Sequence, residues 1–173
     1  VALQIALKLR DYLQQSGAYV VMTREEDRDL ADSGTKGYRK RKVADLHARV
    51  QLIEQVQPNF VISIHLNSIG SPRWYGAQTF YNPTIEESKR LAHLTQQQLV
   101  FNMENTTRVA KQDNSIFLLK SAQVPAVMVE VGFLSNVEEA KLLSQESYQN
   151  RLASSIYKGV LAYLAGETLS STP

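Results

Sequence analysis

The sequence predicts an α/β fold, in which a mostly parallel (mixed) sheet carries helices on both faces. Two observations predict it. Short runs rich in β-branched and aromatic residues alternate along the chain with longer segments whose apolar residues recur at helical spacing. Two of the short runs, Phe60 to Ile64 and Ala126 to Glu130, are almost continuously apolar, which is typical of strands covered on both faces.

Length and composition fit a single domain. The chain has 173 residues, of which 43% are hydrophobic and 21% are charged, so it is long enough to bury a core without disulfide or metal support. We expect residues 1–165 to form this domain and residues 166–173 to be a frayed tail.

Hydropathy, cysteine content and charge exclude several classes of protein. No apolar stretch reaches the roughly 18 residues that span a bilayer, so no membrane span is expected in this chain. The absence of cysteine excludes disulfides and thiolate metal sites. A formal net charge of +2 is too small for a typical nucleic-acid-binding surface, and no nucleic acid partner is expected.

The first part of the chain is predicted to contain two helices separated by a strand and a loop. Residues 1–16 carry apolar residues at helical spacing, and residues 18–23 form a short β-rich run. Residues 24–42 are polar and densely charged, which indicates a surface loop. A second helix begins at Val43 and is closed by Pro58.

Strands and helices continue to alternate after Pro58. The strand Phe60 to Ile64 is followed by a loop over residues 68–76, a strand over 77–81 and a helix over 85–101. Residues 114–120 form either a short strand or a turn of helix, because so short a segment does not distinguish the two periods.

Two further helices follow the strand that ends at Glu130. Asn136, with Glu139 three residues later, resembles a capping box and predicts the start of a short helix through Leu143. The last helix ends near Gly166, and its inward positions are predicted to be Leu152, Ile156, Val160 and Tyr163.

His65 and Glu130 follow the two buried strands at their carboxyl ends. In open α/β sheets, ligands collect in the crevice beyond those ends. His65 alone has a structural alternative, a hydrogen bond to a loop carbonyl. Glu130 needs a partner or a function because a half-buried carboxylate is costly. Together the two residues indicate a functional site.

A histidine that faces a carboxylate suits two chemistries. In one, the imidazole binds zinc and the glutamate deprotonates a water that the metal activates. In the other, the pair acts as an acid/base couple without metal. A catalytic zinc needs three protein ligands, yet the chain has three histidines and no HExxH pattern. Because His47 and His93 fall on predicted helices, we interpret both as structural or solvated.

Several motifs together resemble those of the zinc-dependent N-acetylmuramoyl-L-alanine amidases of the amidase 3 family. They are "VVMTR", "FVISIHLNS" and "VPAVMVEVGFLSN". Three further segments narrow the resemblance to the germination-specific cortex amidases of spore-forming Firmicutes: "DLADSGTKGYRKRKVADLHARV", "SPRWYGAQTFYNP" and "MENTTRVAK". The similarity extends from Val1 to about Leu164.

The resemblance implies a Zn²⁺ held by two histidines and a glutamate, plus a catalytic glutamate. The second zinc histidine of the family falls on His65, and the catalytic glutamate falls on Glu130. The two other ligands belong to a glycine-rich segment and to a glutamate ahead of the first helix, so both are expected upstream of Val1, together with the first strand. Because an open sheet edge would remain, we expect the 173 residues alone to aggregate or to be partly molten.

The implied reaction is zinc-dependent hydrolysis of the amide between N-acetylmuramic acid and the L-alanine of the peptide stem. Peptidoglycan is then the substrate, an accessory protein is a candidate partner, and the setting is extracytoplasmic, in the cell wall or around the forespore. The rival hypothesis is a peptidoglycan-binding or partner-binding module that has lost catalysis. The expected upstream position of two ligands favours that module for the chain as written, whereas the intact motifs favour the enzyme.

Other residues near the two strand ends have paired interpretations. Asn67 is a candidate for substrate binding, or else a turn asparagine that bonds its own backbone. Trp74 and Tyr75 line a glycan groove or pack against the protein. The basic run "KGYRKRK" attracts an anionic partner or is a solvated loop, and Arg24 is expected to form a structural ion pair.

Overall fold

Four strands form one mixed sheet in the computed structural model, which describes residues 1–168. The strands are β1 (Val61–Asn67), β2 (Gln78–Tyr81), β3 (Lys111–Gln112) and β4 (Ala126–Phe133), and their order across the sheet is β1-β4-β2-β3. β4 pairs in parallel with β1 and antiparallel with β2, and β2 pairs in parallel with β3. The predicted mixed, mostly parallel sheet is therefore confirmed.

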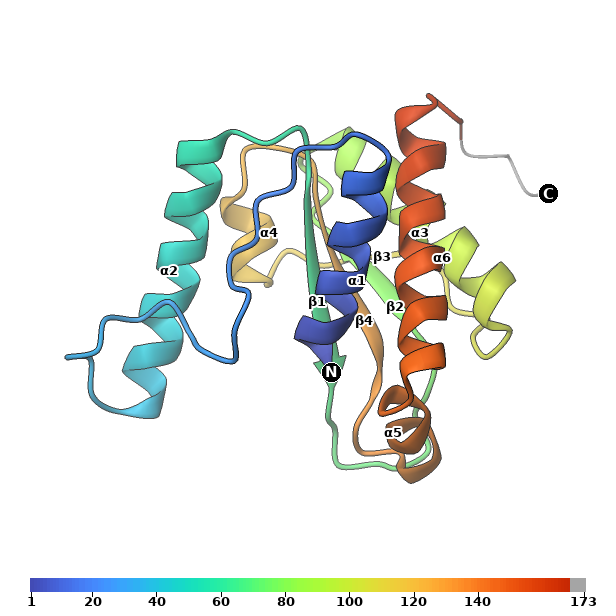
Figure 1. Ribbon diagram of the computed structural model, residues 1–173, viewed down its shortest axis with the longest axis horizontal. Helices are drawn as coiled ribbons and strands as arrows, with labels where there is room; N and C mark the ends of the chain where they lie inside the picture. The colour runs from blue at the N-terminus through green and yellow to red at the C-terminus, as the bar shows by residue number, and fades with distance from the viewer. Residues whose placement is uncertain (169–173) are drawn as a thin grey trace.

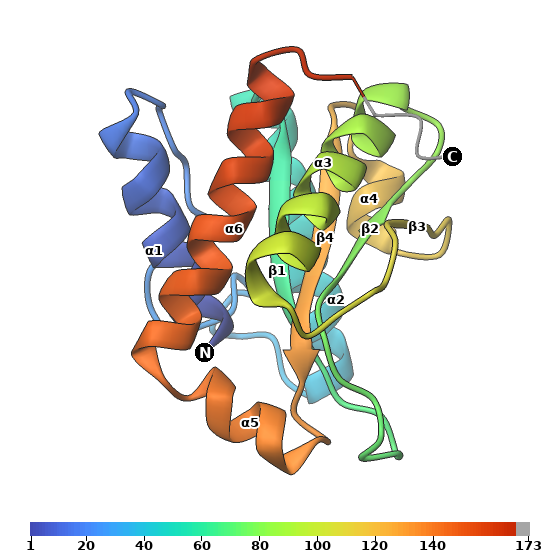
Figure 2. The same ribbon diagram turned by 90° about the vertical axis from the view of Figure 1, so that its right-hand side faces the viewer.

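One face of the sheet is covered by three helices. These are α1 (Ala2–Gln15), α3 (Glu86–Met103) and α6 (Glu146–Leu164), which lie side by side in Figures 1 and 2. The larger core fills the space beneath them, and the inward positions predicted for the last helix are among its buried residues: Leu152, Ile156, Val160 and Tyr163. Here α6 approaches α3 closely at Gly159.

The opposite face is covered by α2 (Tyr38–Val56) and α4 (Phe117–Ser121), which lie together at the left of Figure 1. A smaller cluster of buried side chains joins these helices to the sheet: Ile53, Leu118, Leu119, Ala122 and Ala126. Both faces therefore carry helices, as predicted. The segment 114–120, whose type the sequence left open, contains the short helix α4.

The helix α5 (Val137–Leu143) follows β4 directly. Its cap is the predicted Asn136, whose side chain accepts a hydrogen bond from the Glu139 N–H at 3.0 Å. The reciprocal half of a capping box is absent from the described residues, because the Glu139 carboxylate bonds the backbone N–H groups of Gly76 and Phe133 instead. Figure 1 shows α5 at the end of the molecule where β1 and β4 finish.

Two predictions for the N-terminal half were wrong. Residues 18–23 are not a strand, because within residues 1–168 no strand pairs with them. The second helix begins at Tyr38 rather than Val43, so part of the predicted loop 24–42 is helical. Arg41 explains this start, since its guanidinium is held by the Asp29 carboxylate and by the carbonyls of Asp32 and Thr35.

Strand lengths also differ from the prediction. β1 and β4 extend past Ile64 and Glu130 to Asn67 and Phe133, so His65 lies within its strand rather than after it, and Glu130 lies inside its strand rather than at its end. The two-residue strand β3 was not predicted, because so short a run has no period.

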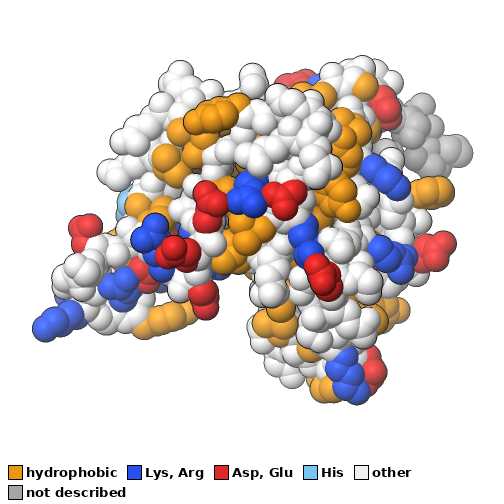
Figure 3. Space-filling model, viewed as in Figure 1, with side chains coloured by type: hydrophobic (Ala, Val, Ile, Leu, Met, Phe, Trp, Pro, Cys, Tyr) orange, Lys and Arg blue, Asp and Glu red, His pale blue; other side chains and the backbone are white. Residues whose placement is uncertain are grey.

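Within residues 1–168, none of the helices is long and apolar enough to cross a membrane. Figure 3 shows Lys and Arg side chains interspersed with Asp and Glu on the face drawn there, so no single-sign field covers it. Of the predicted tail 166–173, residues 169–173 lie outside the described residues.

Candidate active site

His65, Glu130 and Gln78 form a row across three adjacent strands. In the register of the sheet, His65 of β1 is the partner of Glu130 of β4, and Glu130 is also the partner of Gln78 of β2. Neighbouring strands are about 4.8 Å apart, so each residue of the row is one strand away from the next.

The row lies on the face of the sheet that α2 covers. Side chains alternate between the faces of a strand, and Ile64 and Val129 pack into the larger core on the other face. Their neighbours His65 and Glu130 therefore project toward the α2 side. The sequence predicted that these two residues meet, and the register brings them together.

Glu130 is a carboxyl group without a hydrogen-bond partner for one of its oxygens. Its Oε2 is buried and unpartnered among the described residues. Burial disfavours the charged form and raises the pKa of Glu130 above its usual value. A carboxylate held in this way is ready to accept a proton.

His65 has an exposed side and a basic environment. Desolvation by the surrounding chain, followed by the positive charges of Arg49 and Lys42, lowers the pKa of its imidazole. At neutral pH the ring is therefore neutral, with a nitrogen lone pair available to a metal ion or a proton. The alternative hydrogen bond to a loop carbonyl does not occur within residues 1–168.

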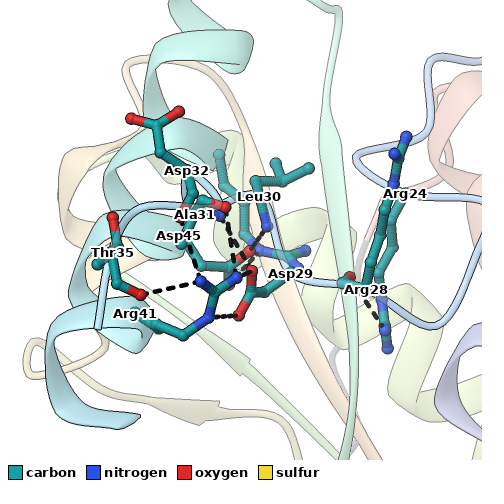
Figure 4. A network of polar contacts seen from close by, with 10 residues as sticks. Arg24, Arg28, Asp29, Leu30, Ala31, Asp32, Thr35, Arg41 and Asp45 are labelled. Atoms are coloured by element: carbon teal, nitrogen blue, oxygen red, sulfur yellow. Dashed lines mark hydrogen bonds and ion pairs between the residues drawn. The ribbon is translucent and has the colours of Figure 1, made fainter. Parts of the chain in front are cut away.

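A polar network fixes α2 beside His65. Asp45 accepts hydrogen bonds from the Leu30 N–H and from Nε of Arg49, both at 2.9 Å, and Arg49 also donates to Oγ1 of Thr23 at 2.8 Å. Figure 4 shows Asp45 and Leu30 of this network next to the pairing of Arg41 with Asp29. The basic run is thus in part structural.

Glu139 ties the loop over residues 68–76 to the end of β4. Its two carboxylate oxygens accept the N–H groups of Gly76 and Phe133, each at 2.8 Å. Gly76 has a φ of 85°, and a Cβ added there would lie 2.7 Å from the carbonyl oxygen of Asn105, so only glycine fits. Burial raises the pKa of Glu139, whereas the two N–H donors lower it.

Arg108 lies at the far end of the row. Its Nη1 donates to Oε1 of Gln78 at 3.2 Å. The guanidinium carbon is 5.3 Å from the ring centroids of both Trp74 and Phe133. Trp74 and Tyr75 remain 50% and 57% exposed, so both expose aromatic surface beside the row.

The remaining predicted residues have simpler surroundings. Asn67 is two positions past His65, beyond a register shift, and its carbonyl accepts from the Leu134 N–H. Arg24 forms the expected ion pair, with Asp27 at 3.1 Å. His47 is exposed on α2 with its ring against Phe117, and His93 packs against Tyr81 on α3, so both lie on helices, which agrees with the interpretation that they are structural or solvated.

No cluster of three or more histidine, cysteine or acidic side chains that could hold a metal occurs within residues 1–168. His65 and Glu130 provide one neutral nitrogen ligand and one adjacent carboxylate. These two groups fit part of a zinc site but fall short of three protein ligands.

Comparison with known proteins decides the family. The N-acetylmuramoyl-L-alanine amidase family (amidase 3) matches residues 1–162. The chain belongs to this family. The amidase is 51% identical over 163 residues to the germination-specific N-acetylmuramoyl-L-alanine amidase of Bacillus subtilis, a match that covers 94% of the chain and 69% of that relative. It is also 30% identical to the amidase LytC of Bacillus subtilis, of which it spans 30%.

Solved structures share the fold of the amidase. The CwlD amidase from Clostridioides difficile, solved in complex with the GerS lipoprotein, matches 95% of the chain and 85% of that chain, with 38% identity and a TM-score of 0.92. The catalytic domain of CwlV from Bacillus (Paenibacillus) polymyxa matches 94% and 82%, with 32% identity and a TM-score of 0.80. The predicted fold class and enzyme type are therefore confirmed.

Three polar residues in or beside the row of His65, Glu130 and Gln78 were not identified from the sequence: Gln78 itself, Arg108 and Glu139. Gln78 was identifiable in principle, because it is a polar residue that shares a strand face with Phe80, but its pairing with Glu130 required the strand order. Arg108 and Glu139 carry no local signal for their contacts, which join segments distant in the chain.

Proposed function

We propose that the chain carries part of the active site of a zinc-dependent amidase that hydrolyses the bond between N-acetylmuramic acid and L-alanine in peptidoglycan. The observation that supports this most strongly is the pairing of His65 with Glu130, whose Oε2 is buried and unpartnered. A buried carboxylate without a partner is costly to a fold, and catalysis is a reason to retain it.

In this proposal His65 binds Zn²⁺ through its neutral imidazole, and the remaining ligands come from outside residues 1–168. When bound, the metal polarises the amide carbonyl and lowers the pKa of water. Burial, and after it the positive charges of Arg49 and Lys42, lower the pKa of His65 and favour the neutral ring, so the ligand needs no deprotonation at neutral pH.

Glu130 is the proposed general base and then general acid. It takes a proton from the attacking water as the carbon–oxygen bond forms. It then delivers that proton to the nitrogen of L-alanine as the carbon–nitrogen bond breaks. Burial raises the pKa of Glu130, which makes it a stronger base than an exposed glutamate and so favours uptake of the proton from water.

We further propose that the enzyme acts outside the cytoplasm on the spore cortex during preparation for germination. The 51% identity to a germination-specific amidase supports this setting. The GerS lipoprotein bound to the Clostridioides difficile relative supports an accessory protein as a partner.

A second candidate is a binding module that recognises peptidoglycan without cleaving it. The lack of a three-ligand metal cluster within residues 1–168 favours this candidate. The binding module and the amidase differ in one prediction: the module binds cell walls without zinc, whereas the amidase needs zinc to cleave them.

Variants of the complete protein test the assignment. Glu130→Gln is expected to lower the rate of peptide release from peptidoglycan by about 10³-fold and to leave zinc content unchanged. His65→Ala is expected to lose both zinc and activity. His47→Ala, at an exposed helical histidine, is the matched control and should retain both. Full activity of Glu130→Gln would refute the role of Glu130, and cell-wall binding without any cleavage by the wild type would favour the binding module.

A further inference from the structure

Arg108 is a half-buried guanidinium that forms no ion pair within residues 1–168. The nearby carboxylate of Glu139 does not bond it, because both oxygens of Glu139 accept backbone N–H groups. One Arg108 nitrogen, Nη1, donates to the neutral amide oxygen of Gln78. The other donors of the fork therefore have no partner in the described chain.

The structure holds this side chain in a defined place. The Arg108 N–H donates to Oγ1 of Thr106 at 3.2 Å, and its carbonyl accepts from Nε2 of Gln96 at 3.0 Å. The guanidinium carbon lies over the rings of both Trp74 and Phe133. A guanidinium fixed by aromatic rings and backbone contacts loses little entropy when it binds an anion.

The position of Arg108 relative to Glu130 follows from the register. Gln78 is one strand, about 4.8 Å, from Glu130. Arg108 bonds the end of the Gln78 side chain, and Figure 2 shows the segment between α3 and β3 running beside β2. The guanidinium thus lies next to the end of the Gln78 side chain and near the ring of Phe133 on β4, the strand that carries Glu130.

We propose that Arg108 binds a carboxylate of the substrate's peptide stem and orients the peptide on the Glu130 row. This inference rests on the proposed amidase function. In peptide stems the residue after L-alanine is D-glutamate, whose α-carboxylate is either free or amidated. Two residues of extended peptide span about 7 Å, which is longer than the strand spacing of about 4.8 Å between Glu130 and Gln78. Arginine is suited to such a contact because its fork binds carboxylates with two parallel hydrogen bonds.

Two matched substrates test the proposal in the complete protein. They are MurNAc-L-Ala-D-Glu, with a free α-carboxylate, and MurNAc-L-Ala-D-isoGln, in which the same group is an amide, and in both the γ-carboxylate is blocked as a methylamide so that only the α-group differs. We expect the wild type to have a lower KM for the free acid. Arg108→Gln should raise KM for the acid about 10- to 100-fold, with little change for the amide. Arg108→Lys, which keeps the charge but loses the fork, should be intermediate.

Controls separate binding from a structural role. Lys111→Gln removes the same charge from an exposed position three residues away and should leave both KM values unchanged. A merely structural Arg108 would lower the rates on both substrates equally and lower the melting temperature. That result, or equal KM values of the wild type for acid and amide, would overturn the proposal.

If the protein hydrolyses neither compound, a binding measurement still tests whether Arg108 binds the carboxylate. Calorimetric titration of both compounds into Glu130→Gln protein should show a preference for the free acid that disappears when Arg108→Gln is added. If the wild type hydrolyses neither compound but this preference is present, the proposed amidase function fails and the Arg108 site stands. If the preference is absent, the Arg108 site fails whatever the activity.

Discussion

At the scale of single residues, the buried carboxylate of Glu130 lowers the stability of the folded protein. Its Oε2 is buried without a hydrogen-bond partner, and burial raises its pKa. Because its pKa is higher in the folded state, protonated Glu130 contributes to stability. That contribution is complete below the ordinary glutamate pKa of about 4.3, where the group is protonated in both states. That contribution is lost as the pH rises through the raised value, so ionised Glu130 opposes folding at neutral pH.

Replacing the charge should therefore stabilise the metal-free protein. We expect Glu130→Gln to raise the free energy of unfolding at pH 7.5 by about 1 kcal/mol. The gain should shrink toward zero near pH 4, where wild-type Glu130 is protonated. Urea denaturation at both pH values measures this difference. A Glu130→Gln protein that is less stable than wild type at pH 7.5 would contradict our description of the carboxylate.

Glu139 differs from Glu130 because both of its oxygens are used. Glu139→Ala should leave the buried N–H groups of Gly76 and Phe133 without acceptors and should lower the free energy of unfolding by about 2–4 kcal/mol. Glu138→Ala, at the exposed neighbour on α5, is the control and should change stability by less than about 0.5 kcal/mol. Equal stabilities of the two variants would show that the loop is not held by Glu139.

Some site residues have a local pattern in the sequence, and others are linked only by the order of the strands. The pairing of His65 with Glu130 was predictable because each interrupts an apolar run near the carboxyl end of a strand, and their catalytic roles stay a prediction. Gln78 and Arg108 were not found, because their relation to Glu130 depends on β2 lying next to β4. Strand order is a property of the fold that no local pattern specifies.

At the scale of elements, the crossing of α3 and α6 depends on Gly159. A Cβ at that position would lie 2.5 Å from the Thr95 Cα, which is backbone and cannot rotate away. Gly159→Ala should therefore push the helices apart, despite alanine's better helix propensity, and lower the free energy of unfolding by about 1–3 kcal/mol. Thermal denaturation of Gly159→Ala and wild type measures this loss of stability. An unchanged or higher melting temperature would contradict this packing.

Helices were predicted better than the segments between them. α1, α3 and α6 carry apolar residues at helical spacing over many turns, so the sequence located them well. The start of α2 was placed too late because Arg41 is fixed by Asp29 across the preceding loop, which a period does not reveal. Residues 18–23 have strand composition, but composition without a pairing partner does not form a strand.

At the scale of the whole molecule, one edge of the sheet is open in the described chain. β1 pairs with β4 on one side and has no strand on its other side within residues 1–168. Unpaired edges promote association between chains. We expect the 173-residue chain to form oligomers or aggregates at micromolar concentrations, as measured by light scattering. A monodisperse monomer with a sharp, reversible melt would contradict this expectation.

The central claim concerns which bond the complete protein breaks. Mass spectrometry of the products released from purified peptidoglycan tests it most directly. An amidase acting through Glu130 releases peptides that begin with a free L-alanine amine and leaves the glycan strands uncut, and Glu130→Gln releases the same peptides about 10³-fold more slowly. Products with new sugar reducing ends, or equal rates of peptide release from wild type and Glu130→Gln, would contradict the account.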